Sequence, residues 1–325
     1  MKQAVLKALR QKEHISGEEL AKQLHVSRTA VWKCVGQLRK KGYSIQSAPG
    51  LGYSLAASPD LLLPEEISAG LTTKYIGRRI EHFEEIGSTQ ERARQLAAEQ
   101  AEEGTAVVAE RQTGGRGRLG RSWASPPHTG IYVSIILRPN LKPTDVRHIP
   151  LITGVATCQA IERVTGTKPR IKWPNDVLID GKKVAGILAE MGAEVDRLHY
   201  IALGIGINVN TRTSMLPREV QGTATSLAVQ CGKKVSRVRL LQALFEELEL
   251  VYEEFKESGF RPGREHWKAL DGTIGSRVRV SMGESELEGK ALDLDPDGAL
   301  VIQRDDGGLE KVIAGDVSLG IHQRG

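Results

Sequence analysis

Apolar residues recur every three or four positions in three short segments of the first sixty residues. This spacing predicts an amphipathic helix near the amino terminus and two more helices that begin after Ser16 and Ser27, where each serine can cap the first turn. In the third helix the apolar residues face inward, its polar and basic residues face outward, and Gly42 ends it. Two helices joined by a tight turn, the second with a polar outer face, predict a helix-turn-helix.

A predicted hairpin follows, because residues 43–56 form two short strand-like runs around Pro49-Gly50. A helix-turn-helix followed by a hairpin is typical of winged-helix DNA-binding domains; the alternative is a three-helix packing unit without a partner. We expect the third helix to enter the major groove, and the hairpin with Lys40 and Lys41 to contact phosphates. The residues assigned to DNA are Arg28, Thr29, Lys33 and Gln37.

The pattern changes near residue 75, where short apolar strand-like runs begin to alternate with helical stretches. Asp180-Gly181 between two apolar runs predicts a type I′ hairpin, and antiparallel pairing there argues against a purely parallel nucleotide-binding sheet. Towards the end of the chain, short alternating runs separated by glycine turns predict a small β-barrel. The sequence therefore predicts an α+β protein with a winged helix over 1–60, a mixed α/β domain over 61–268 and a barrel over 269–325.

Charge is distributed unevenly along the chain. The formal net charge is +5, yet residues 1–57 contain ten Lys or Arg and three Asp or Glu, so the remainder is slightly acidic. This asymmetry predicts a polyanionic partner for the first module. We expect no membrane partner, because no apolar run approaches the ~20 residues that span a bilayer. The three cysteines are far apart and the start of the chain lacks a signal-peptide pattern, so we expect a cytoplasmic protein with reduced thiols.

A segment of unusual composition, GGRGRLGRSW at 114–123, holds four glycines and three arginines. It matches neither the dinucleotide-binding glycine pattern nor a P-loop. Glycines allow backbone N–H groups to approach an anion, and arginines neutralise that anion with forked donors. The segment therefore predicts a loop that wraps a phosphate or a carboxylate.

Two further segments supply complementary chemistry. In IKWPNDVLIDGKKVAGILAEM, Asp176 lies near the predicted anion site, where a second negative charge is costly unless it holds a cation such as Mg²⁺ or an ammonium group. In LGIGINVN, Gly204 and Gly206 predict close approach by a ligand or another backbone. Asn208 and Asn210 end that strand with amides suited to reading a base or ribose.

In this order and at these separations, GRGRLGRSW, KWPNDVLIDGKKVAGIL and LGIGINVN resemble the biotin–protein ligases, and the winged helix resembles that of members that also repress the biotin operon. The resemblance implies a class II synthetase-like central domain and an SH3-like barrel. It also implies that biotin and ATP form biotinyl-5′-AMP, with Mg²⁺, before biotin passes to a lysine of a biotin carboxyl carrier protein domain. Biotinyl-AMP would then be the corepressor, with a homodimer binding operator DNA.

The resemblance also implies the site residues. Those carried over to biotin are Ser88, Thr89, Gln90, Gln112, Arg116, Gly117, Arg118 and Lys183, with Gln90 replacing the usual asparagine. Those carried over to ATP are Arg118, Arg121, Trp123, Lys172, Asn175, Asp176 and Asn208. The predicted catalytic residues are Lys183, Arg118, Arg116 and Asp176, with Asp176 also the candidate for Mg²⁺.

Two alternatives belong to other functional classes. One is a lipoate or octanoate ligase, whose catalytic domain is related; the GRGRLGR and KWPND segments together favour biotin. The other is a ligand-sensing repressor without catalysis, against which the complete set of arginines and lysines argues.

Overall fold

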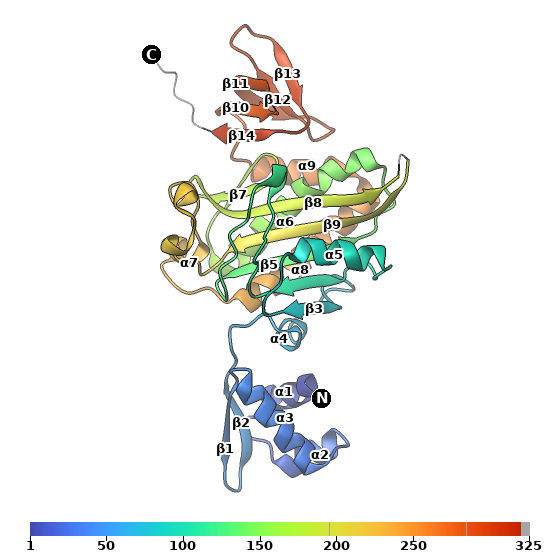
Figure 1. Cartoon of the computed structure of the whole chain (residues 1–325), viewed down its shortest axis with the longest axis vertical. Helices are drawn as coiled ribbons and strands as arrows, with labels where there is room; N and C mark the ends of the chain where they lie inside the picture. Colours follow the sequence, from blue (N-terminus) through green and yellow to red (C-terminus); the bar gives the residue numbers. More distant parts are fainter. Residues whose placement is uncertain (195, 284, 320–325) are drawn as a thin grey trace. The chain divides into compact units, whose positions relative to one another are not determined.

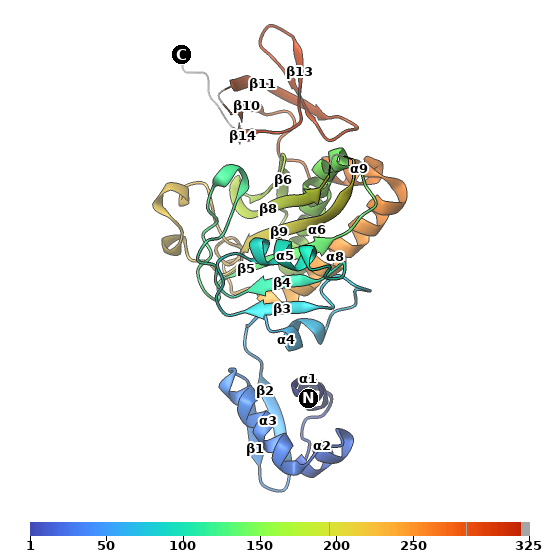
Figure 2. The same ribbon diagram turned by 45° about the vertical axis from the view of Figure 1, so that its right-hand side comes forward.

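The computed structural model describes residues 1–194, 196–283 and 285–319. The chain divides into two compact units, Met1–Gly70 and Leu71–Gly325. Figures 1 and 2 show the elements of each unit. Among the described residues, none of the helices combines the length and apolar character needed to cross a membrane.

The first unit is the predicted helix-turn-helix with its hairpin. Its elements are α1 (Lys2–Gln11), α2 (Gly17–Gln23), α3 (Arg28–Lys40), β1 (Ser44–Ala48), β2 (Gly52–Ala57) and α4 (Pro64–Ser68). The predicted caps are present, because Ser16 Oγ accepts from the Glu19 backbone N–H at 3.0 Å and Ser27 Oγ from that of Ala30 at 3.1 Å. The inward apolar residues of the helices form one buried core.

Helix α4 packs into this first unit through its two glutamates. Glu66 pairs with Arg10 at 2.6 Å and accepts a hydrogen bond from the Tyr43 hydroxyl, and Glu65 pairs with Lys41 at 2.9 Å. These contacts explain why the compact unit continues to Gly70, past the predicted domain boundary at residue 60.

The second unit contains a seven-stranded mixed sheet in the order β3-β4-β5-β9-β8-β7-β6. Only β3 and β4 pair in parallel among these described strands. The strands are β3 (Ile80–Phe83), β4 (Ala106–Ala109), β5 (Gly130–Leu137), β6 (Arg170–Lys172), β7 (Asp176–Ile179), β8 (Lys182–Ala193) and β9 (Leu198–Asn208). The predicted type I′ turn joins β7 to β8, with positive φ angles of 49° at Asp180 and 72° at Gly181.

Helices cover both faces of this sheet. The α-helices are α5 (Thr89–Ala98), α6 (His148–Thr165), α7 (Leu227–Cys231), α8 (Arg237–Ser258) and α9 (Phe260–Ala269), with 3₁₀ turns at Arg118–Gly120, Pro143–Arg147, Thr213–Met215 and Arg218–Val220. Helix α5 lies on one face, while α6 and α8 pack together on the other (Figure 1). All eight residues of β5 are buried, as expected for a strand in the middle of a covered sheet.

The predicted carboxy-terminal β-module is a five-stranded antiparallel sheet in the order β13-β12-β11-β10-β14. Its strands are β10 (Arg277–Met282), β11 (Ser285–Leu294), β12 (Leu300–Gln303), β13 (Leu309–Val312) and β14 (Asp316–Leu319). The turn between β11 and β12 holds it to the central domain, because Trp173 Nε1 donates to Gly298 O at 3.1 Å and Arg264 Nε to Leu294 O at 2.7 Å. Strand β14 lies beside the central sheet, where Val317 O accepts from Lys172 Nζ at 3.0 Å.

Candidate active site and nucleic-acid interface

A cavity of about 830 Å³ lies over β5, β9 and β8, beyond the amino-terminal end of α5. Every residue predicted to bind biotin or ATP lines it. These residues are Ser88, Thr89, Gln90, Gln112, Arg116, Gly117, Arg118, Arg121, Trp123, Lys172, Asn175, Asp176, Lys183 and Asn208. They come from segments that are up to more than one hundred residues apart in the sequence, and the fold brings them together around one cavity.

The arginine loop forms one wall of this cavity and folds back on itself. Gly117 N donates to Arg121 O at 2.7 Å, and a Cβ at Gly115 would lie 2.4 Å from Trp123 O, so only glycine fits there. Arg118 Nη1 donates to Asn175 Oδ1 at 2.9 Å. Arg121 Nη2 pairs with Asp316 Oδ2 at 2.5 Å. Arg116 Nη2 lies 3.5 Å from Glu91 Oε2, so all three guanidinium groups have partners from other segments.

Asp176 is the electrostatic centre of the site. Its Oδ1 lies 2.6 Å from Lys183 Nζ and its Oδ2 lies 3.1 Å from Lys172 Nζ. Burial alone would raise the pKa of Asp176, but the charges and hydrogen bonds of the two lysines outweigh burial and lower it. The carboxylate therefore stays ionised and fixes two cations in the cavity.

The strand glycines make room for side chains and also line the cavity, so the close approach of a ligand expected from the sequence stays a prediction. A Cβ at Gly206 would lie 2.5 Å from the Trp123 indole, and one at Gly204 would lie 2.6 Å from Gln90 Oε1. Lys183 Nζ also lies 5.3 Å from the centroid of the Trp123 ring. The glycines thus allow Trp123 and Gln90 to lie directly on the sheet.

A continuous hydrogen-bond network supports the α5 end of the cavity. Gln112 Oε1 accepts from the Thr89 backbone N–H at 2.9 Å, and Gln112 Nε2 donates to Ser125 Oγ at 2.9 Å. Gln90 Nε2 donates to the backbone carbonyl of Ala202 at 2.8 Å. Gln90 Oε1 accepts from a neighbouring serine hydroxyl at 3.0 Å. Both polar atoms of the Gln90 amide are therefore engaged within the protein.

Three buried polar atoms in the cavity wall make no hydrogen bond within the described part of the chain: Ser88 Oγ, Trp123 Nε1 and Asn208 Oδ1. Buried polar groups are ordinarily satisfied, so these three atoms are available to hydrogen-bond a polar ligand in the cavity. Asn210, the other amide that the sequence suggested, is different. It exchanges two hydrogen bonds with the Val235 backbone and holds that segment in place.

Sequence reasoning missed the contribution of β14. Asp316, Val317, Ser318 and Leu319 line the cavity, and Val317 O accepts from Lys172 Nζ at 3.0 Å. No local motif marks these residues, because their place in the site depends on how the carboxy-terminal sheet packs. The 3₁₀ turn that contains Glu219 and Val220 was missed in the same way.

A resident metal site is not formed by the described residues, since no group of three or more His, Cys, Asp or Glu side chains lies together there. Both oxygens of Asp176, the predicted Mg²⁺ ligand, already face lysine ammonium groups. The cavity therefore lacks the all-protein oxygen cage that a permanently bound divalent ion requires.

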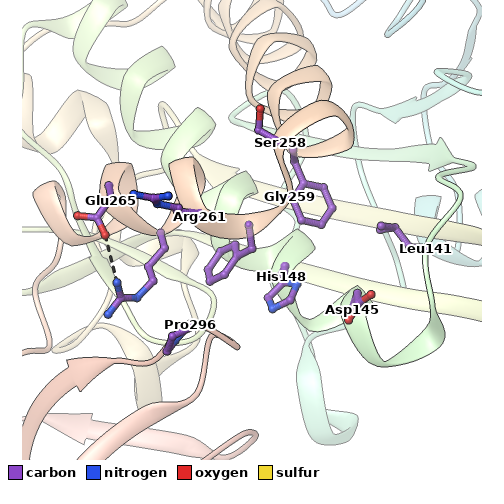
Figure 3. Close-up of a pocket in the computed structure, with 11 residues that line it drawn as sticks. Leu141, Asp145, His148, Ser258, Gly259, Arg261, Glu265 and Pro296 are labelled. Atoms are coloured by element: carbon purple, nitrogen blue, oxygen red, sulfur yellow. Dashed lines mark hydrogen bonds and ion pairs between the residues drawn. The ribbon is translucent and has the colours of Figure 1, made fainter.

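A second cavity lies between the end of α8, α9 and the turn from β11 to β12 (Figure 3). His148 lies in its wall, stacked on Phe260 with ring centroids 4.3 Å apart, and its Nε2 donates to Asp297 O at 3.0 Å. Burial lowers the pKa of His148, which favours the neutral ring in this contact. None of the predicted site residues lies here, and the contacts serve to hold the carboxy-terminal sheet in place.

The predicted DNA-contacting side chains lie together on the outer face of α3. Arg28, Thr29, Lys33 and Gln37 are all exposed. Lys41, by contrast, is directed to Glu65, and residues 43–57 of the hairpin contain no Lys or Arg. Lys41 and the hairpin therefore offer no unpaired cation to phosphates, whereas Lys40 is exposed and its expected phosphate contact stays a prediction.

Three family models match successive parts of the chain. The biotin/lipoate A/B protein ligase family matches residues 83–208, a helix-turn-helix domain matches 2–54, and the carboxy-terminal domain of biotin protein ligases matches 273–320. A ligase of the biotin/lipoate class with an amino-terminal helix-turn-helix is the type of protein that the fold and the cavity define.

Similar proteins narrow this class. The chain is 39% identical over 308 residues to the bifunctional ligase/repressor BirA of Bacillus subtilis, covering 95% of this chain and 94% of the relative. It is 32% identical over 307 residues to that of Escherichia coli, covering 94% and 93%. The structure of the Aquifex aeolicus biotin protein ligase in complex with biotin and ATP matches with a TM-score of 0.65 and 33% identity, over 75% of this chain and 99% of that chain. The chain belongs to the family of bifunctional biotin ligase/repressors.

Proposed function

We propose that this protein activates biotin with ATP to biotinyl-5′-AMP, transfers biotin to a lysine of a biotin carboxyl carrier protein domain, and represses biotin biosynthesis genes through its winged helix. The observation that carries the ligase activity is the convergence of the predicted residues on one cavity that holds cations and unsatisfied polar atoms. Membership of the bifunctional family supports joining both activities in one chain.

Biotin would occupy the end of the cavity beside α5. The unpaired Ser88 hydroxyl is a suitable partner for the ureido ring, and Thr89 and Gln112 are held in place by their mutual hydrogen bond. We assign Gln90 a shaping role, because both ends of its amide are already bonded. Arg116 and Gly117 of the loop would then cover the ring and the carboxylate.

Adenylation brings the biotin carboxylate against the α-phosphate. At ~4 Å and an effective dielectric near 20 the repulsion of two such charges is about 4 kcal/mol, so cations must cancel it. Lys183 and Lys172, fixed by Asp176, and Arg118, fixed by Asn175, are the cations we assign to this task. They are positioned before the substrates arrive, which is the condition for electrostatic stabilisation of a transition state.

The remaining part of the cavity would bind the nucleotide. The Trp123 indole is available to stack on adenine, and Asn208 Oδ1 is free to accept from a base or ribose donor. Arg121 would reach the phosphates. We propose that Mg²⁺ enters with ATP, because this ion keeps several waters and binds through one or two carboxylates plus substrate phosphates.

Transfer of biotin requires a lysine from the carrier domain to reach the activated carboxyl. Asp176 would attract the incoming lysine through its charge but not accept its proton, since the pKa of Asp176 is lowered. The lysine would lose that proton to water and attack as the neutral amine, so that the amide bond forms while the carboxyl–phosphate bond breaks and AMP leaves. A mixed anhydride hydrolyses in water, and closure of the loop at 114–123 over the cavity protects it.

The test of the enzymatic proposal is pyrophosphate release from ATP by the purified protein. Biotin should support release, whereas lipoate and octanoate should support little. Release that depends on lipoate would favour the alternative ligase within the same broader family, and no release with any of the three would indicate a sensor without catalysis.

Repression is assigned to the first unit, with the contacts on α3. Arg28→Ala combined with Lys33→Ala should abolish operator binding and leave pyrophosphate release at the wild-type rate. Loss of both activities would contradict the division into a winged helix over 1–60, a catalytic domain over 61–268 and a barrel over 269–325.

We further propose that biotinyl-AMP promotes homodimerisation, because a symmetric operator needs two recognition helices. Ordering the loop before association removes an entropic cost, and coupling of this kind amounts to about 1–3 kcal/mol. Sedimentation with and without biotin plus ATP tests this: an unchanged monomer–dimer constant would exclude it. A cytoplasmic location follows from these partners and from the three unpaired cysteines.

A further inference from the structure

The outer face of α3 carries a solvent-exposed tryptophan side chain. Trp32 is 65% exposed, in a chain whose other three tryptophans are not among the exposed large apolar residues. It lies one turn after Arg28 and next to Lys33, and neither of these cations forms an ion pair within the described residues. Removing apolar surface from water is favourable, so the free domain gains nothing by holding an indole in this position.

A glycine follows one turn later on the same face. Gly36 lies inside α3, where glycine is less favourable than alanine. A Cβ built on Gly36 would meet no heavy atom within 4 Å, so the packing of the protein does not require glycine there. Residues four apart lie one above the other on a helix, which places Trp32 beside this open stretch of backbone.

The charges around Trp32 indicate which kind of partner binds over its exposed indole. A second copy of the same face would bring Arg28 and Lys33 against their own like charges, which opposes association. DNA offers phosphates to these cations and base edges to the indole. The hairpin carries no Lys or Arg, so the cations nearest Trp32 belong to α3 itself.

We propose that Trp32 contacts base edges in the major groove and that Gly36 lets the sugar–phosphate backbone approach α3 closely. Side chains lean towards the start of their helix, so the indole lies over the turn that contains Arg28, where recognition helices contact bases. An apolar ring suits the methyl group of thymine. This inference rests on the proposed DNA binding of the first unit and makes Trp32 a determinant of operator specificity.

The experiment uses the full-length protein with biotin and ATP. Wild-type protein enriches a duplex from a randomised library, and fluorescence anisotropy then compares that duplex with a scrambled one of equal composition. Trp32→Ala should bind the enriched duplex at least about tenfold more weakly, with little change for the scrambled duplex. Trp32→Phe should retain most of the affinity. Leu250→Ala, which removes an apolar side chain of similar exposure on α8, is the matched control and should bind like wild type.

Gly36→Ala separates binding from stability. Alanine favours the helix, and nothing in the protein opposes its methyl group, so thermal unfolding of the first unit should occur at the same or a higher temperature. Affinity for the enriched duplex should nevertheless fall. Unchanged affinity would overturn the proposed close approach at Gly36.

Tryptophan emission provides a second readout. Binding of the enriched duplex should quench emission in the wild type, and the change should disappear in Trp32→Phe. The proposal for Trp32 is overturned if Trp32→Ala binds the enriched duplex normally, or if it loses affinity equally for both duplexes. If the wild type enriches no duplex, the proposed DNA binding fails together with this inference, whereas normal enrichment with an indifferent Trp32→Ala removes only the inference.

Discussion

Replacing Lys183 with alanine should slow formation of biotinyl-AMP by roughly 10²–10³-fold. Lys183 lies 2.6 Å from Asp176, in the cavity wall, and is 32% exposed. The repulsion that it helps to cancel is about 4 kcal/mol at ~4 Å and an effective dielectric near 20, equivalent to about 10³-fold in rate. Partial exposure screens the charge and reduces this value, and loss of a single transition-state donor ordinarily costs 10²–10³-fold.

The protein should still fold after this change, because Asp176 keeps Lys172 at 3.1 Å as a counter-charge. The assay is pyrophosphate release at saturating biotin and ATP, with circular dichroism to confirm folding. Lys182→Ala is the matched control: it removes the adjacent lysine of the same strand, which is exposed and does not line the cavity. A rate for Lys183→Ala within about threefold of wild type, or an equal loss in Lys182→Ala, would refute the assigned role.

Three other changes test separate parts of the site. Asp176→Asn should destabilise the protein at neutral pH by about 1–3 kcal/mol, because two lysines lose their counter-charge. The pKa of Asp176 is lowered in the folded protein, so this carboxylate contributes stability above its unfolded pKa and loses it as pH falls through the folded pKa. Denaturant melts at pH 7 and pH 3 should therefore differ less in the variant than in the wild type. The Arg118→Gly variant should still form biotinyl-AMP but release it, and mass spectrometry should then find biotin on lysines of proteins other than the carrier. If those proteins remain unmodified, Arg118 does not retain the adenylate. Asp316→Asn should free Arg121 and remove a negative charge near the phosphates, so the KM for ATP should fall about fivefold. Asp305→Asn, in an exposed ion pair of the same sheet, is the control and should leave this KM unchanged. A raised KM for Asp316→Asn would show that the Asp316 carboxylate assists ATP binding.

Local patterns predicted most of the fold. The caps at Ser16 and Ser27 depend only on neighbouring residues, and the turn at Asp180-Gly181 needs only two positive φ angles, so each could be inferred from a few letters. Strand β6 was not predicted, because three residues carry no detectable period. Helix α9 was not predicted, because Pro262 and Gly263 near its start are residues that disfavour a helix.

The parts of the candidate site that could be predicted are those in which the interacting residues belong to one local motif. Lys172 and Asp176 are four residues apart, and Lys183 lies across a hairpin from them, so their proximity follows from local structure. The contribution of Asp316 could not be predicted, because it meets Arg121 only after the carboxy-terminal sheet packs on the central domain. The contact between Gly204 and the Gln90 side chain could not be predicted for the same reason, because Gln90 belongs to a helix that is distant in sequence.

Mass spectrometry of a purified biotin carboxyl carrier domain after incubation with this protein tests the proposed reaction most directly. With biotin and ATP together, the carrier should gain one biotinyl group on one lysine, and omission of either substrate should leave it unmodified. The Lys183→Ala variant should yield little product in the same time, and Lys182→Ala should yield the wild-type amount. A carrier that stays unmodified with both substrates present, or that accepts lipoate in place of biotin, would contradict the assignment of the cavity to biotin activation.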